Sequence, residues 1–139
     1  MSNRNPIYVD TEPVRTVFKI NASYQHQNLK VTVEYLVKDE GWIYGGTNYL
    51  FLNREYIFKS DSIEPVKEKI GIVSSLNGSE FKVKSRIFLF YPAGGAIKAP
   101  VITTKISFFI DGDLLESFDS PSNGSYFTSF NSWIRFEMV

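Results

Sequence analysis

Polar and apolar residues alternate with a period of two along much of this chain, and this pattern constrains the fold more than any other feature. The clearest case begins at Leu29 and ends at Val37, where every second residue is apolar or aromatic and Lys30, Thr32 and Glu34 lie between them. Such alternation is typical of a strand with one buried and one solvated face, as in antiparallel sheets. Val, Ile, Thr and aromatic residues, which prefer strands, supply 53 of 139 residues, whereas Ala, Leu and Met supply 14. The chain is therefore predicted to be all-β.

Further strands are predicted wherever similar runs stand between turn residues. They are expected at residues 14–20, 49–52, 55–59, 70–75, 81–91, 101–110, 114–118, 125–130 and 133–139. Pairs of Asn or Asp with Gly, which tolerate positive φ and favour tight hairpins, occur at positions 77–78, 111–112 and 123–124. One short helix is expected at residues 62–70, where Ser62 can cap the helix and Pro65 lies in its first turn.

These elements predict one β domain over residues 1–139, with residues 1–13 as an extended N-terminal arm. About eight or nine short strands with hairpin turns favour an antiparallel β-sandwich, immunoglobulin-like or jelly-roll-like. A small closed β-barrel is the alternative. Residues 91–100, bracketed by prolines, are expected to form a crossover or an exposed loop.

A glycine-rich segment at residues 41–49 contains three aromatic candidates for binding, Trp42, Tyr44 and Tyr49. Flexible backbone could turn these rings outward, where they would serve sugar stacking, a membrane interface or a protein contact. The preferred alternative is a hairpin that turns at Gly45 and Gly46 and holds the rings in the core or at its rim. Tyr91, at the start of the predicted crossover loop, is a further binding candidate.

The C-terminal part of the chain is also rich in aromatic residues, and these are expected to pack in the core. Ile134, Phe136 and Met138 alternate as a final strand should. The aromatic residues concerned are Tyr126, Phe127, Phe130, Trp133 and Phe136.

Charge is unevenly distributed, although 15 basic residues balance 15 acidic ones. Residues 81–110 hold five basic side chains and no acidic one, whereas residues 111–139 hold five acidic side chains against Arg135. If the two segments are neighbours in one sheet, cross-strand pairs neutralise them. If they lie on different faces, the molecule has a basic and an acidic side, which suits head-to-tail assembly into rings or filaments.

The basic residues Lys82, Lys84 and Arg86 fall on one side of a predicted strand and are candidates for partner binding. Phe88 and Phe90 then take over that side. This switch of polarity predicts either a bulge that changes the register or a strand that passes into another environment.

The sequence offers little equipment for catalysis or for binding a metal ion. The single histidine, His26, lies in a polar turn and is expected to be solvated, and no G-x-S-x-G motif or cysteine is present. The densest carboxylate group could offer oxygen ligands to calcium, but a hairpin turn with solvated acids explains it more simply. We therefore expect a non-enzymatic protein without a metal or cofactor. That carboxylate group consists of Asp111, Asp113, Glu116 and Asp119.

Composition also bears on partners and location. A net charge of zero provides no field for holding a polyphosphate, so nucleic-acid binding is not expected. The first twenty residues lack the apolar core of a signal peptide, and the longest apolar run, residues 87–91, is too short to span a bilayer. A soluble cytoplasmic protein is the default expectation, with a removed signal or signal-free export as alternatives.

Residues 106–133, about a fifth of the chain, resemble bacterial immunoglobulin-like modules. The resemblance rests on a strand that ends at Ile110, the turn at Asp111 and Gly112, a short return strand, and the aromatic pair Tyr126 and Phe127. It implies a sandwich fold and a binding or spacer role.

Two functions are expected from these observations. The first is a structural subunit or protein-protein interaction module, including self-association through its basic and acidic segments. The alternative is a ligand-binding module, either lectin-like or acting at a membrane surface as toxins do, through loop aromatics.

Overall fold

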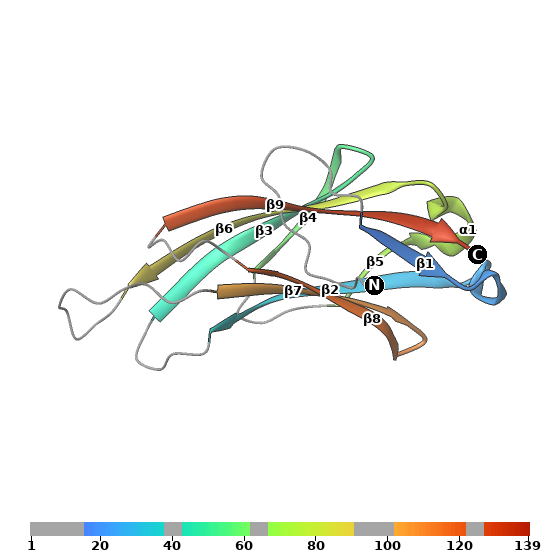
Figure 1. Cartoon of the computed structure of the whole chain (residues 1–139), viewed down its shortest axis with the longest axis horizontal. Coiled ribbons are helices and arrows are strands. Elements are labelled where there is room, and N and C mark those ends of the chain that lie inside the picture. The colour runs from blue at the N-terminus through green and yellow to red at the C-terminus, as the bar shows by residue number, and fades with distance from the viewer. Residues whose placement is uncertain (1–15, 38–42, 62–66, 91–101, 122–126) are drawn as a thin grey trace.

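The chain folds into two β-sheets that pack face to face. The computed structural model describes residues 16–37, 43–61, 67–90, 102–121 and 127–139. Within these residues, the strand order is β1-β9-β6-β3-β4 in one sheet and β5-β2-β7-β8 in the other, and Figure 1 shows the two layers. Because each sheet ends in edge strands instead of closing on itself, the fold is a β-sandwich and not a closed barrel. The predicted all-β sandwich is confirmed.

The two sheets contain nine strands within the described parts of the chain. The five-stranded sheet consists of β1 (Val17–Ile20), β3 (Ile43–Leu52), β4 (Glu55–Asp61), β6 (Glu80–Phe90) and β9 (Phe127–Met138). The four-stranded sheet consists of β2 (Asn28–Val37), β5 (Glu68–Ile72), β7 (Ile102–Ile110) and β8 (Asp113–Pro121). Neighbouring strands are antiparallel, except that β1 pairs in parallel with β9.

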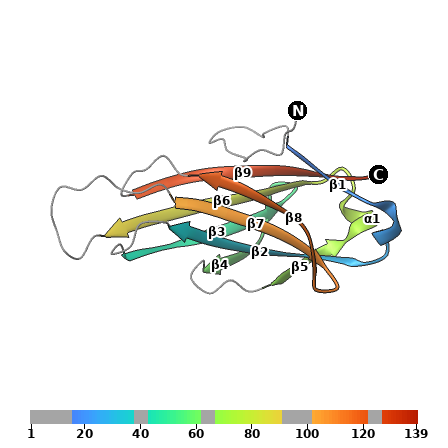
Figure 2. The same ribbon diagram turned by 60° about the horizontal axis from the view of Figure 1, so that its bottom comes forward.

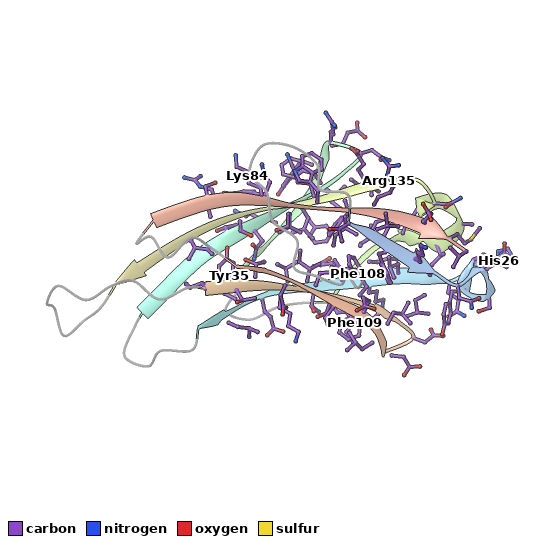
Figure 3. The ribbon with its side chains drawn as sticks, viewed as in Figure 1. His26, Tyr35, Lys84, Phe108, Phe109 and Arg135 are labelled. Carbon is purple, nitrogen blue, oxygen red and sulfur yellow. The ribbon has the colours of Figure 1, made fainter. Side chains whose placement is uncertain are left out.

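The apolar core between the sheets is built around the ring of Phe108 on β7. Its centroid lies 4.9 Å from that of Phe18, 5.7 Å from that of Phe81 and 5.5 Å from that of Phe136. Figure 3 shows Phe108 between the two sheets and its neighbour Phe109 on the outer side of the four-stranded sheet. The alternation read from the sequence therefore sorts consecutive phenylalanines to opposite faces, and Phe136 lies in the core as predicted.

A second part of the interior is polar. Asn48, Ser85 and Thr104 are fully buried, and the Ser85 hydroxyl donates a 2.8 Å hydrogen bond to Oδ1 of Asn48. The Thr104 hydroxyl lies 3.3 Å from that of Ser85 and can donate to it, since the Ser85 proton is already used. Buried hydroxyls and amides are costly unless they are paired in this way, so the network specifies how the two sheets meet.

Tyr35 of β2 explains why the chain has a glycine at position 46. Its hydroxyl crosses the sandwich and donates to the backbone oxygens of Thr47, at 3.3 Å, and Arg86, at 3.2 Å. A Cβ atom at Gly46 would lie 2.9 Å from Cε2 of Tyr35 and would overlap the carbonyl oxygen of Arg86. The predicted hairpin turn at Gly45 and Gly46 is therefore wrong: β3 runs straight through both glycines, which allow this close approach.

The short predicted helix is also misplaced. Residues 62–66 lie outside the described residues, and residues 68–72 form strand β5, which pairs with β2. The single α-helical turn within the described residues, α1 (Val73–Leu76), follows β5 and replaces the end of the strand expected at 70–75. It forms there because Val73 and Leu76, three residues apart on one helical face, are both buried.

The turn at Asn77 and Gly78 connects the two sheets and does not form the predicted hairpin between neighbouring strands. Asn77 has φ −58° and ψ 123°, Gly78 has φ 83°, and the Ser79 amide donates to the Leu76 carbonyl, which defines a type II turn. The turn carries the chain from α1 into β6, and Figure 2 shows α1 at this end of the sandwich.

Two predictions concern the long strands of the five-stranded sheet. The strands expected at 125–130 and 133–139 form one continuous strand, β9, because both parts pair with β6 or β1. β6 pairs in unbroken register with β3 and β9, so the polarity switch at Phe88 is not caused by a bulge.

The predicted N-terminal arm, the 91–100 loop and the 123–124 turn lie outside the described residues. No helix in the described segments is long and apolar enough to cross a membrane.

Candidate binding face

The outer face of the five-stranded sheet carries a cluster of basic and aromatic side chains. On β6, Val83 and Ser85 are buried and point into the sandwich. Because side chains alternate along a strand, Lys82 and Lys84 point outward. The strand register places Lys84 opposite Tyr49 of β3 and Lys82 opposite Phe51. Figure 3 shows Lys84 on the outer side of this sheet.

Neighbouring strands extend the cluster on both sides. Tyr56 of β4 pairs with Phe51, and Lys59 pairs with Tyr49, so their side chains join the same face. Trp133 of β9 pairs with Lys82 on the other side. We define the basic aromatic face as Tyr49, Phe51, Arg54, Tyr56, Lys59, Lys82, Lys84, Arg86 and Trp133.

Cation–π contacts organise the centre of this face. The ammonium nitrogen of Lys82 lies 4.2 Å from the ring centroid of Phe51 and 5.1 Å from that of Trp133. The guanidinium carbon of Arg54 lies 5.5 Å from the centroid of Trp133. Attraction between each cation and the negative face of the ring holds the long side chains close to the sheet. Partial burial, followed by the nearby charges of Lys84 and Arg54, lowers the pKa of Lys82 below its usual range.

Trp133 corrects a prediction, because it does not belong to the core between the sheets. It is buried, with 6% of its surface exposed, but it faces outward between Lys82 and Arg54. The intersheet core on β9 is formed instead by its neighbours in the alternation, Ile134 and Phe136. Side chains alternate between the two faces of a strand, so Trp133 lies on the opposite face of β9 from Ile134 and Phe136.

A set of aromatic rings reaches the surface next to the cations. The centroid of Tyr56 lies 5.8 Å from that of Phe51 and 6.5 Å from that of Tyr49. Tyr56 is 54% exposed, and the other two rings are half-buried. Exposed aromatic rings beside cations offer both apolar contact area and charge, a composition common in protein contact surfaces.

The turn that positions Arg54 carries an unfavourable backbone conformation. Asn53 and Arg54 join β3 to β4 with φ values of 51° and 71°, as in a type I′ turn. Asn tolerates this region and is anchored here, since its Oδ1 accepts from the Glu80 amide at 2.9 Å. Arg lacks that tolerance, and a left-handed residue with a Cβ costs about 1–2 kcal/mol. Glycine is the usual residue at this position, so the Arg side chain is retained at a cost to folding.

Replacing Arg54 with glycine removes its side chain from the basic aromatic face and also relieves the strained backbone, so this variant should be more stable than the alanine variant. We expect the free energy of unfolding of Arg54→Gly to exceed that of Arg54→Ala by about 1 kcal/mol, because both lose the side chain but glycine alone relieves the backbone. The Arg54 ion pair with Glu80, at 3.4 Å and largely solvated, adds little to either comparison. Urea denaturation followed by circular dichroism measures the difference. If the alanine variant were as stable as the glycine variant, the positive φ at position 54 would not be a source of backbone strain.

The structure brings together four of the seven predicted binding residues. Tyr49, Lys82, Lys84 and Arg86 share the basic aromatic face through the pairing of β3 with β6. Tyr44 lies on β3, but its side chain is outside the described set, as are Trp42 and Tyr91. His26, predicted to be solvated, is exposed in a turn at one end of the sandwich, as Figure 3 shows.

Sequence reasoning missed five members of the face, of which Lys59 lies opposite Tyr49 only through the register between β3 and β4. Phe51 could have been found, because it lies two residues from Tyr49 in a strand and therefore shares its side. Tyr56 and Trp133 depend on the register between strands, which no local pattern specifies. Arg54 gave no signal, because its turn contains no glycine.

Asp111, Asp113, Glu116 and Asp119 lie on the β7–β8 hairpin of the other sheet. Asp111 and Gly112, with φ values of 51° and 81°, form the predicted tight turn between β7 and β8. Lys105 lies opposite both Glu34 of β2 and Asp119 of β8, so cross-strand neutralisation applies to it. Lys82 and Lys84 lie instead on β6 of the five-stranded sheet, where their register partners on β3 and β9 are aromatic or uncharged.

No group of three or more histidine and acidic residues among the described residues is arranged to hold a metal ion.

Comparison with known proteins finds no matching family model, no significantly similar curated protein and no significantly similar solved structure. The resemblance of residues 106–133 to bacterial immunoglobulin-like modules thus stays a prediction. Any function assigned to this chain rests on its own residues.

Proposed function

We propose that this chain is a non-enzymatic protein-interaction module that docks an acidic partner protein on the basic aromatic face. The observation that carries the proposal is the setting of Lys82 and Lys84. Lys82 lies between Phe51 and Trp133, and Lys84 between Tyr49 and Asn131, while Glu80, on the same side of β6, pairs with Arg54. Cations without neutralising neighbours leave a local positive field.

The composition of the face favours a protein over other partners. Aromatic residues and arginine dominate the energetics of protein interfaces, and the face offers the exposed side chains of Tyr56 and Arg54. Surrounding lysines steer an acidic surface toward these rings. A net charge of zero for the whole chain disfavours a long polyanion, which needs extended positive potential.

The proposal is tested by titrating the chain with a fluorescein-labelled oligo-glutamate peptide and following fluorescence anisotropy at low and high salt. The double variant Lys82→Glu/Lys84→Glu is expected to weaken binding about tenfold or more, since two attractive charges become repulsive. Binding by the wild-type chain should also weaken with added salt, because the charges are exposed.

The chain supplies a matched control on the opposite sheet. Lys30 and Lys69 are exposed and lie opposite each other on β2 and β5, so Lys30→Glu/Lys69→Glu makes the same change of charge elsewhere. This variant should bind the peptide within about twofold of wild type, a change well below 1 kcal/mol. Equal losses in the two variants would indicate a non-specific charge effect and overturn the assigned face. Tighter binding of single-stranded DNA or a sulfated glycan than of the peptide would overturn the choice of a protein partner.

A second candidate function, carbohydrate or membrane-surface binding, is supported by the aromatic rings of this face. Tyr49, Phe51 and Tyr56 form an adjacent set with one ring largely exposed, and such rings stack on sugars or enter lipid interfaces. A neutral glycan array and sedimentation with neutral lipid vesicles test it. Binding lost in Tyr56→Ala but retained in Lys82→Glu/Lys84→Glu would favour this candidate.

A further inference from the structure

We infer that the acidic partner is a second copy of this chain, whose β7–β8 hairpin docks on the basic aromatic face. This inference rests on the proposed function and names the partner for the same site. It makes the chain a structural subunit that assembles head to tail.

The β7–β8 hairpin has the complementary chemistry. Asp111 and Asp113 are exposed at its tip, and Glu116 follows on β8. Leu114, between these acids, is 57% exposed. Asp113 lies opposite Ile110 and Glu116 opposite Phe108, on the inner side of β8, whereas Leu114 lies on the outer side, so the edge of the hairpin presents the charges and the apolar side chain together. The opposing face combines positive charge with the exposed ring of Tyr56.

The exposure of Leu114 follows from the local register. A shift in the β7–β8 pairing after Phe108 places Leu114 opposite Phe109 on the outer side, while Leu115 packs against the core. Bulges of this kind redirect side chains at sheet edges. Since Leu115 already contributes to the core, Leu114 is available to contact another molecule.

Edge position also makes the hairpin accessible. β8 is the last strand in the order of the four-stranded sheet, so no described strand covers its outer edge. Arg54 and Lys82 on one molecule would face Asp113 and Glu116 on the next. Tyr56 and Phe51 would supply the apolar contact for Leu114.

The two surfaces lie on opposite sides of one molecule. Figure 1 shows the β3–β4 hairpin above the sandwich and the β7–β8 hairpin below it. They therefore cannot satisfy each other within one chain. A contact between two different patches is heterologous and repeats from subunit to subunit, which gives filaments or closed rings.

Charge-reversed variants test the contact directly by sedimentation velocity and light scattering over a wide range of concentrations. The wild-type mass should rise with concentration above the monomer mass of 15.9 kDa, and less so at high salt. Lys82→Glu/Lys84→Glu and Asp113→Lys/Glu116→Lys should each remain monomeric alone, because like charges then face one another. An equimolar mixture of the two should reach at least about twice the monomer mass, since each variant supplies the complement of the other.

Controls make the result specific to these surfaces. Lys30→Glu/Lys69→Glu should assemble as wild type does, and circular dichroism should show that every variant folds. A wild-type chain that stays monomeric, together with a mixture that does not associate, overturns the second copy as the partner. If oligo-glutamate binding still depends on Lys82 and Lys84, the proposed function stands with a different acidic protein. If that binding is also absent, both fail.

Discussion

Replacing Phe108 with alanine should lower the free energy of unfolding by about 3–5 kcal/mol, a large share of the stability of a domain this size. The ring is fully buried and contacts aromatic rings on both sheets. Four phenylalanine centroids lie within 6.0 Å of it, at distances of 4.9, 5.7, 6.0 and 5.5 Å for Phe18, Phe81, Phe118 and Phe136. Removing it leaves a cavity that rigid neighbours from three or more strands cannot fill.

Phe109 is the matched control for this substitution. It is the next residue on β7 but points outward, half-buried, with the Lys67 ammonium 4.2 Å from its ring. Phe109→Ala should therefore cost clearly less than Phe108→Ala in urea denaturation. Equal costs would mean that β7 does not alternate between core and surface as described.

Replacing Gly46 with alanine should lower the free energy of unfolding by about 3 kcal/mol, near the upper end of the usual cost of overpacking. The added Cβ would overlap the Arg86 carbonyl, which belongs to the backbone of the paired strand and cannot move alone. Relief would require β3 to separate from β6 or the Tyr35 ring to leave its position. Thermal and urea denaturation measure the loss.

Gly71 on β5 provides the comparison for Gly46. A Cβ there would lie 3.4 Å from Cδ2 of Leu76, the end of a flexible side chain. Gly71→Ala should cost little or even stabilise, because alanine is about 0.5–1 kcal/mol better than glycine within a strand. If Gly46→Ala were as mild as Gly71→Ala, the close approach of Arg86 and Tyr35 to Gly46 would be disproved.

The strands were predictable because their alternation is local. β2 and β7 appear in the sequence with the same inward residues that the structure buries, including Val31, Val33, Ile106 and Phe108. Gly45 and Gly46 misled for the opposite reason. A pair of glycines favours a turn locally. Here, however, a glycine is needed at position 46 because the ring of Tyr35 leaves no room for a Cβ, and Tyr35 lies eleven positions earlier in the chain and on the other sheet.

The segment around α1 shows a second limit of local patterns. Pro65 and Ser62 suggested a helix start, but the helical turn comes later, where burial of Val73 and Leu76 fixes it. Pairing with β2 makes residues 68–72 a strand, and such pairing energy exceeds weak helix propensity.

The candidate site was half predictable. A period of two places Lys82, Lys84 and Arg86 on one side of β6 from sequence alone. The aromatic neighbours follow from which strands flank β6, and that depends on the packing of the whole chain. The same dependence separates Lys82 and Lys84 on β6 from the acidic residues of the β7–β8 hairpin, because β6 and β8 belong to different sheets.

The most direct test of the binding face is an NMR titration of the labelled chain with the oligo-glutamate peptide, read residue by residue. A bound partner changes the chemical shifts of the groups it contacts, so the surface is mapped without substitution. We expect the largest changes at Lys82, Lys84 and Tyr49, with little change on the outer side of the four-stranded sheet. Changes confined to the four-stranded sheet, or no changes at peptide concentrations that saturate the anisotropy signal, would contradict binding at the basic aromatic face.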